Sequence, residues 1–211
     1  YHVVWQNVIV SAWYKDIYNN TGPRGFSITK RIKTFLHAIK ILFGIREYGN
    51  KFDDFKYSIK IICADYFIKD GKFGINDNLK MIYSFDSSKF GELNYKQLGL
   101  SGLTFNFKNN ELYVLTSFEE NEKYDGYLWH ISLSDLFENK PLSPVYDNEG
   151  NKFLSFAPHK PEGIAIIDDE TAIIVFDDNR ILNYKTTEKN DIIEYSRKPN
   201  ECWYSIIKFT R

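Results

Sequence analysis

Apolar and polar residues follow the same pattern in two stretches of this chain, residues 102–117 and residues 163–178, which align without a gap. In each stretch a glycine opens an apolar strand, a polar turn follows, and a second apolar strand ends in small polar or acidic residues. The second copy starts 61 residues after the first, at Gly163 instead of Gly102. This spacing predicts repeated antiparallel hairpins rather than one sheet without a repeat.

Strand patterns also occur outside the two hairpins, as alternating or continuous apolar residues. A third strand is expected after each hairpin, at residues 126–132 and residues 180–184, with Trp129 and Tyr184 near the same point. The remaining predicted strands cover residues 3–13, 57–67, 79–85 and 202–209. The sequence therefore predicts an all-β chain made of units of three or four antiparallel strands.

Residues 27–44 depart from this pattern. Ser27 is a candidate N-cap, Gly44 a candidate stop, and apolar residues from Ile28 to Phe43 fall on one helical face. The alternative is a strand, because apolar residues also occupy both alternating rows of residues 35–42. We favour a short helical insertion that packs against a sheet.

A unit of three or four strands cannot bury both of its faces alone, so the units must cover one another. Radial stacking gives a β-propeller, in which neighbouring sheets cover each other and edges stay short. A β-sandwich has similar strand patterns but gives no reason for an ungapped repeat. We therefore expect residues 1–211 to form a single propeller-type domain of about four blades, near the lower limit for a closed propeller.

The start of the chain adds to this expectation. Tyr1 opens directly on a strand-like segment, without a methionine or a signal peptide. We therefore expect that the N-terminal part is missing, and that the propeller is incomplete or is completed by another segment or chain. The sequence does not assign a compartment. No stretch approaches the roughly 18 consecutive apolar residues of a membrane span, so no transmembrane segment is expected. Cys63 and Cys202 fit no metal or redox pattern, and buried free thiols are favoured over a disulfide.

Composition provides a large core and argues against one class of partner. The chain is 43% apolar and 17% aromatic, with 15 Tyr and 17 Phe, which favours strands over helices. Its 27 basic and 28 acidic residues give a net charge of −1, so no positive field points to nucleic acid. The phosphate-binding loop, the dinucleotide fingerprint and the Gly-x-Ser-x-Gly nucleophile pattern do not occur in the sequence.

One segment resembles a known signature. Residues 161–164 (Pro-Glu-Gly-Ile) and residues 176–179 (Phe-Asp-Asp-Asn) are similar to a motif of phytase-like and esterase-like bacterial propellers and of a neighbouring uncharacterised propeller family. Residues 100–104, 113–117 and 127–129 resemble the preceding blade of that uncharacterised family. The resemblance spans residues 57–183. It implies a propeller fold and, for the activity, divalent-metal-dependent hydrolysis of phosphate or other esters.

The resemblance also implies a site. Glu162 would face a central channel and ligate a divalent cation, usually calcium, with Asp177 and Asp178 beside it. His159 would lie near the channel mouth as a general base. Calcium needs six to eight oxygen ligands, which several blades must supply together. The first hairpin has neutral residues at the matching positions, Ser101 for Glu162 and residues 116–117 for the aspartates, so the acidic set is not repeated.

Two functions follow from these observations. The first is a non-catalytic binding or scaffold module, which takes an unknown protein or small molecule on the face formed by the loops near Glu162 and Asp177. The second is a metal-dependent hydrolase with Glu162, Asp177 and Asp178 as ligands and His159 as base. Because the acidic set occurs once, the sequence favours the binding module.

Overall fold

The structure is a computed structural model that describes residues 9–14, 39–48, 56–86, 98–120, 123–178, 183–188 and 191–209. These residues confirm an all-β chain with one short helix, α2 (Leu133–Phe137). The first five strands are β1 (Ile9–Tyr14), β2 (Ile39–Tyr48), β3 (Lys56–Lys69), β4 (Lys72–Ile75) and β5 (Lys80–Phe85). The next four are β6 (Gly99–Asn106), β7 (Glu111–Glu120), β8 (Lys123–Ser132) and β9 (Ser143–Pro144). The last five are β10 (Pro161–Asp168), β11 (Thr171–Phe176), β12 (Asn183–Glu188), β13 (Asp191–Ser196) and β14 (Tyr204–Lys208).

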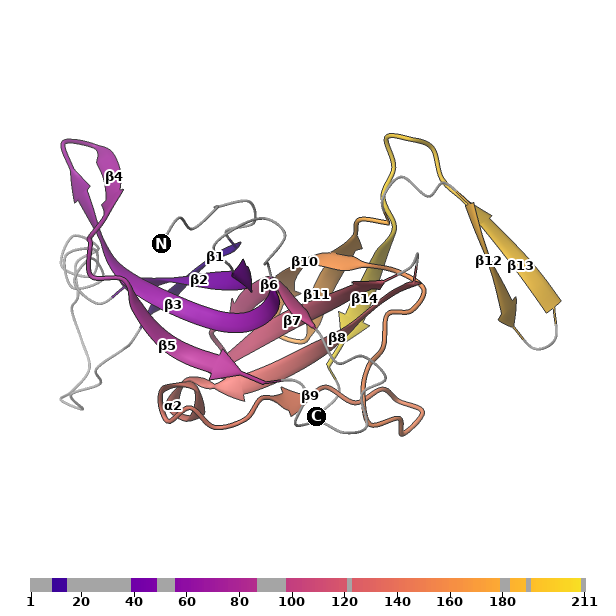
Figure 1. Ribbon diagram of the computed structural model, residues 1–211, viewed down its shortest axis with the longest axis horizontal. Coiled ribbons are helices and arrows are strands. Elements are labelled where there is room, and N and C mark those ends of the chain that lie inside the picture. Colours follow the sequence, from indigo (N-terminus) through magenta and orange to yellow (C-terminus); the bar gives the residue numbers. More distant parts are fainter. Residues whose placement is uncertain are drawn as a thin grey trace, which may run out of the picture.

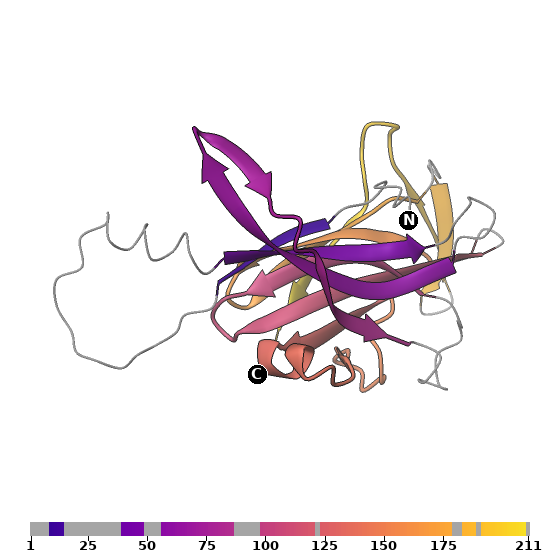
Figure 2. The same ribbon diagram turned by 60° about the vertical axis from the view of Figure 1, so that its left-hand side comes forward.

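The strands form three larger sheets and one separate hairpin, and all pairings are antiparallel. The N-terminal sheet has the order β1-β2-β3, with β5 beside β3; the far half of β3 pairs with β4 in an extension that projects from the sheets in both views (Figure 1, Figure 2). The central sheet has the order β6-β7-β8-β9, and the C-terminal sheet the order β10-β11-β14. The outlying hairpin consists of β12 and β13.

The central sheet is buried on both faces. One apolar cluster packs it against the N-terminal sheet and includes Leu42, Leu112 and Trp129. A second cluster packs its other face against the C-terminal sheet and includes Leu128 and Ile174. Because the sheet is covered on both faces, consecutive residues of β7 and β8 are buried instead of every second one.

The two similar hairpins lie in different sheets, residues 102–117 in the central sheet and residues 163–178 in the C-terminal sheet. Both contain a β-bulge immediately before the glycine. The pairing steps from Leu100↔Thr116 to Gly102↔Leu115 in the first, and from Pro161↔Phe176 to Gly163↔Val175 in the second. Ser101 and Glu162 are therefore the extra residues of two equivalent bulges.

The predicted helical insertion is wrong where the structure describes it. Residues 27–38 lie outside the described residues, but residues 39–44 belong to strand β2. Leu42 packs into the cluster between the N-terminal and central sheets, whereas Ile41 and Phe43 join a third cluster with Ala64. Apolar residues therefore occupy both faces of β2, and such a run imitates the spacing of a helical face.

The predicted third strand of the second hairpin is also misplaced. The neighbour of β11 is β14, with Val175 opposite Tyr204, whereas β12 pairs only with β13. Residues 180–182 lie outside the described residues. Ile207 of β14 packs into the cluster between the central and C-terminal sheets. This burial favours β14 over the more polar β12 as the neighbour of β11.

Three other expectations can be compared with the described residues. Cys63 is a buried free thiol, as predicted, whereas the free thiol of Cys202 is exposed. Within the described part of the chain, no helix has the length and apolar character that crossing a membrane requires. The described sheets do not close into a propeller or barrel, so the blade arrangement stays a prediction.

Leu128→Ala tests the packing of the central sheet on the C-terminal sheet. Leu128 is fully buried between them, so its truncation should lower the free energy of unfolding by about 2–5 kcal/mol. The half-exposed Leu79 is the matched control, and Leu79→Ala should change that free energy by less than about 0.5 kcal/mol. Urea unfolding measures both, and equal effects would contradict this packing.

Candidate functional site

An ion pair joins the N-terminal sheet to the C-terminal sheet. Nη1 of Arg46 on β2 donates to both carboxylate oxygens of Glu162 on β10, at 2.7 and 2.8 Å. The Arg46 side chain is only 8% exposed and Glu162 is 23% exposed. Glu162 is the bulge residue of β10, and Arg46 stands where the β2–β3 pairing is irregular, between Ile45 and Glu47. Irregular pairing thus directs both side chains away from the regular rows of their sheets.

Gly99, at the start of β6, makes room for this pair. A Cβ atom at position 99 would lie 2.9 Å from Cγ of Arg46 and 2.9 Å from Cδ1 of Tyr57. The Arg46 guanidinium also lies over the Tyr57 ring, 5.7 Å from its centroid. Because Gly99 has no side chain, the Arg46 side chain can extend along the edge of the central sheet and reach Glu162.

Lys160 extends the ion pair to the central sheet. Its Nζ lies 2.8 Å from Oε2 of Glu119 on β7 and 3.4 Å from Oε1 of Glu162. Burial acts to lower the pKa of Lys160, but the hydrogen bond to Glu119 and the charge of Glu162 outweigh it and raise the pKa. For Arg46 too, burial lowers the pKa while the charge and hydrogen bonds of Glu162 raise it, with a net upward shift. Oε1 of Glu47 also lies 3.7 Å from Nε of Arg46, so two cations face three carboxylates in this cluster.

His159 and Asp178 form a second polar pair near this cluster. Nδ1 of His159 lies 2.5 Å from Oδ2 of Asp178, and the backbone N–H of Lys160 donates to Oδ1 at 2.9 Å. Asp178 is buried, and the His159 ring stacks on Phe176 with 4.9 Å between centroids. The pair therefore fastens the loop before β10 to the end of β11.

The structure does not bring the four residues predicted for the site into one cluster. Glu162 is engaged with Arg46 and Lys160, Asp178 is engaged with His159, and Asp177 is exposed. Among the described residues, no group of three or more His, Cys, Asp or Glu side chains is placed to hold a metal ion. The calcium site and the role of His159 as a base therefore stay predictions. Sequence reasoning missed Arg46 and Lys160, because nothing in the sequence pairs a bulge in one sheet with a bulge 116 residues away.

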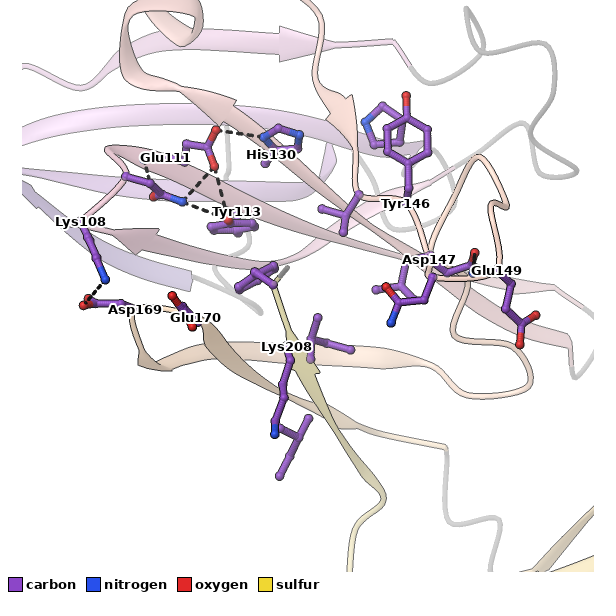
Figure 3. A pocket seen from close by; sticks show the side chains of 18 residues that line it. Lys108, Glu111, Tyr113, His130, Tyr146, Asp147, Glu149, Asp169, Glu170 and Lys208 are labelled. Carbon is purple, nitrogen blue, oxygen red and sulfur yellow. Dashed lines mark hydrogen bonds and ion pairs between the residues drawn. The ribbon is translucent and has the colours of Figure 1, made fainter. Parts of the chain in front are cut away.

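A pocket of about 810 Å³ lies at the other end of the hairpins, between the central and C-terminal sheets (Figure 3). Its floor is apolar, with Tyr113 and Phe209 stacked at 4.6 Å between ring centroids. Val145, Leu154 and Ile207 complete the floor. Small-molecule sites usually combine a concave apolar surface with a few polar groups, and the lining of this pocket has more polar side chains than that pattern.

Polar side chains border this pocket. Glu111 accepts hydrogen bonds from Asn109 Nδ2 at 3.1 Å and from the Tyr113 hydroxyl at 3.3 Å, and Lys108 pairs with Asp169 at 2.9 Å (Figure 3). Burial raises the pKa of the Tyr113 hydroxyl, which keeps it a neutral donor. The carboxylates of the lining are Glu111, Asp147, Glu149, Asp169 and Glu170, against Lys108 and Lys208. The sequence predicted a polar turn in each hairpin, and it gave no signal that the two turns border one pocket.

No protein-family model, no curated protein and no solved structure matches this chain.

Gly99→Ala tests the passage of Arg46 along the central sheet. The new Cβ would displace Arg46 or Tyr57, so we expect a loss of about 1–3 kcal/mol in the free energy of unfolding. In an Arg46→Ala background the same substitution should cost less, because one of the two contacts is gone. Gly163→Ala is the control, since its Cβ would meet only a half-exposed methyl group of Val175. Equal costs of Gly99→Ala in both backgrounds, measured by urea unfolding, would contradict this role.

Proposed function

We propose that this protein is a non-catalytic binding module, and that the pocket between its central and C-terminal sheets takes a ligand that combines an apolar ring with a positive charge. The pocket itself is the observation that carries the proposal. It is large enough for a small molecule or a protein side chain, and its polar groups surround an apolar floor.

The floor supports an apolar ring as one half of the ligand. Tyr113 and Phe209 present a stacked aromatic pair, and the exposed ring of Tyr146 also lines the pocket. Aromatic surfaces prefer offset-stacked or edge-to-face contacts with other rings. A ring that enters the pocket can therefore contact the stacked pair, and Tyr146 adds an exposed aromatic surface.

The border supports a positive charge as the other half. Five carboxylates line the pocket against two lysines, and one of these lysines, Lys108, is paired with Asp169. The local charge is therefore negative, although the whole chain is nearly neutral. A cation near several carboxylates gains Coulomb energy that an anion of the same shape would lose.

The propeller interpretation belongs to this proposal. In it, the N-terminal, central and C-terminal sheets are successive blades, and Arg46, Ser101 and Glu162 lie together near the common axis. Support comes from the equivalent bulges of two sheets and from the burial of the central sheet on both faces. The resemblance to phytase-like and uncharacterised propellers is consistent with this arrangement.

We do not extend the proposal to hydrolysis. Glu162, the first ligand in that hypothesis, already binds Arg46 through both oxygens. Asp178 accepts one hydrogen bond from the Lys160 backbone and contacts His159. Both carboxylates therefore already have partners within the fold. The pocket, in contrast, is open.

Three probes with the same ring test the proposal: 2-phenylethylammonium, 3-phenylpropanol and 3-phenylpropionate. We expect the cation to bind most tightly and the anion most weakly, as measured by titration calorimetry or by chemical-shift changes. Tyr146→Ala should weaken all three probes, and Glu149→Gln should weaken only the cation, about two- to fivefold for one exposed charge. Glu120→Gln removes a carboxylate outside the pocket and is the control. Tightest binding of the anion, or no binding of any probe, would contradict the proposal.

A further inference from the structure

The outer edge of β14 has no neighbouring strand among the described residues. The backbone N–H of Phe209 donates to the carbonyl of Glu170 at 2.8 Å, and that of Phe176 donates to the carbonyl of Trp203 at 3.1 Å. Hydrogen bonds of an antiparallel ladder alternate along each strand, so the odd-numbered residues of β14 bond to β11. The backbone N–H and C=O groups that point to the outer edge belong to Tyr204, Ile206 and Lys208. Of the described strands, β11 alone pairs with β14.

The equivalent edge of the central sheet is covered by the chain itself. Tyr204 lies in the row of strand partners that starts at Gly163, the glycine after the bulge of β10. Leu128 lies in the corresponding row of the central sheet, which starts at Gly102. The Leu128 carbonyl accepts a hydrogen bond from the backbone N–H of Val145 at 2.9 Å, and β9 continues this pairing antiparallel to β8. The central sheet therefore has a fourth strand at the place where the C-terminal sheet ends with β14.

The pocket lies beside this outer edge. Residues 206–209 line it from β14 and its end, and residues 145–149 line it from the segment after β9 (Figure 3). Ile207 packs into the cluster between the central and C-terminal sheets. Because paired residues of neighbouring strands point to the same face, a residue added opposite Ile207 would point to that side as well. The inward side chains of a strand added beside β14 would therefore enter the pocket.

The outlying hairpin leaves the outer edge of β14 unpaired. The Tyr195 ring of β13 contacts the ring of Trp203, with 6.0 Å between centroids, at the residue before β14. The ladder of β13 is formed with β12 and not with β14. This ring contact holds the hairpin near the start of β14, and the outward backbone groups of β14 still have no strand partner among the described residues.

We propose that the outer edge of β14 binds an extended peptide of a partner protein. The peptide adds a strand antiparallel to β14 and places an aromatic and a basic side chain in the pocket. In this mode of recognition the main-chain hydrogen bonds supply affinity, and pockets for alternate side chains supply specificity. Carboxylates of the lining outnumber its lysines, Lys108 and Lys208, so a basic side chain matches the local charge. This inference rests on the proposed function of the pocket and names the class of its ligand.

The blocked hexapeptide acetyl-Thr-Lys-Val-Phe-Val-Thr-amide tests strand addition, because its lysine and phenylalanine lie on the same side of a strand. Four versions each carry a methyl group on the backbone nitrogen of one of the four central residues. Methylation should weaken binding about tenfold where the N–H faces β14 and change it little where the N–H faces solvent. The losses measured by titration calorimetry should therefore alternate along the peptide. Equal losses at neighbouring positions would overturn the proposal.

Tyr204→Pro tests the same contact from the side of the protein. Proline removes an N–H that points to the outer edge, and no hydrogen bond to β11 is lost. We expect about tenfold weaker binding of the hexapeptide and unchanged binding of 2-phenylethylammonium, since Tyr204 does not line the pocket. Tyr204→Ala keeps the N–H and is the matched control, with hexapeptide binding within about twofold of the unmodified protein. Equal effects of proline and alanine on the hexapeptide would contradict strand addition.

The small probe separates this inference from the proposed function. If 2-phenylethylammonium binds and the hexapeptide does not, the pocket takes a small ligand and strand addition is overturned. If neither binds, the proposed function fails and this inference fails with it. Binding of both, with losses that alternate along the methylated peptides, supports the two together.

Discussion

The Arg46–Glu162 ion pair is the interaction on which the arrangement of the three sheets depends. Apolar clusters hold neighbouring sheets together in pairs, but this pair connects the first sheet to the third. Nη1 of Arg46 contacts both oxygens of Glu162 and the pair is mostly buried, so each partner would leave a poorly solvated charge if the other were lost. Gly99 leaves room for the Arg46 side chain, and Lys160 links the ion pair to Glu119 of the central sheet. The interaction therefore sets how the ends of three sheets meet.

This constraint assigns different roles to the two ends of the hairpins. Near Glu162 oppositely charged side chains pair with one another, and these pairs hold strands and loops in place. At the opposite end the central and C-terminal sheets border a pocket with an aromatic floor, and carboxylates outnumber lysines along its border. Glu162, Asp177 and Asp178, the acidic residues that the sequence analysis singled out, lie at the end where ion pairs hold the sheets together. The pocket lies at the other end, beside the two hairpin turns, for which the sequence predicted no function.

The sequence predicted the features that depend on local pattern. The all-β class and both hairpins followed from apolar periodicity and turn residues, because those signals act within a few positions. β2 was misread because burial on both faces removes the period-two signal. The neighbour of β11 was misassigned because burial of Ile207, not distance along the chain, selects β14. The partner of Glu162 could not be predicted, since a contact between bulges of different sheets depends on the packing of whole sheets.

A double-mutant cycle on Arg46→Met and Glu162→Gln tests the central claim most directly. Methionine keeps the apolar stem of the arginine, and glutamine keeps the shape of the glutamate, so the cycle isolates the charge pair. The account predicts that each single substitution destabilises the fold and that the two effects are coupled by about 1.5–3 kcal/mol in urea unfolding, as expected for charged hydrogen bonds. Effects that add to within about 0.5 kcal/mol would show that the two side chains do not interact, and would contradict the account.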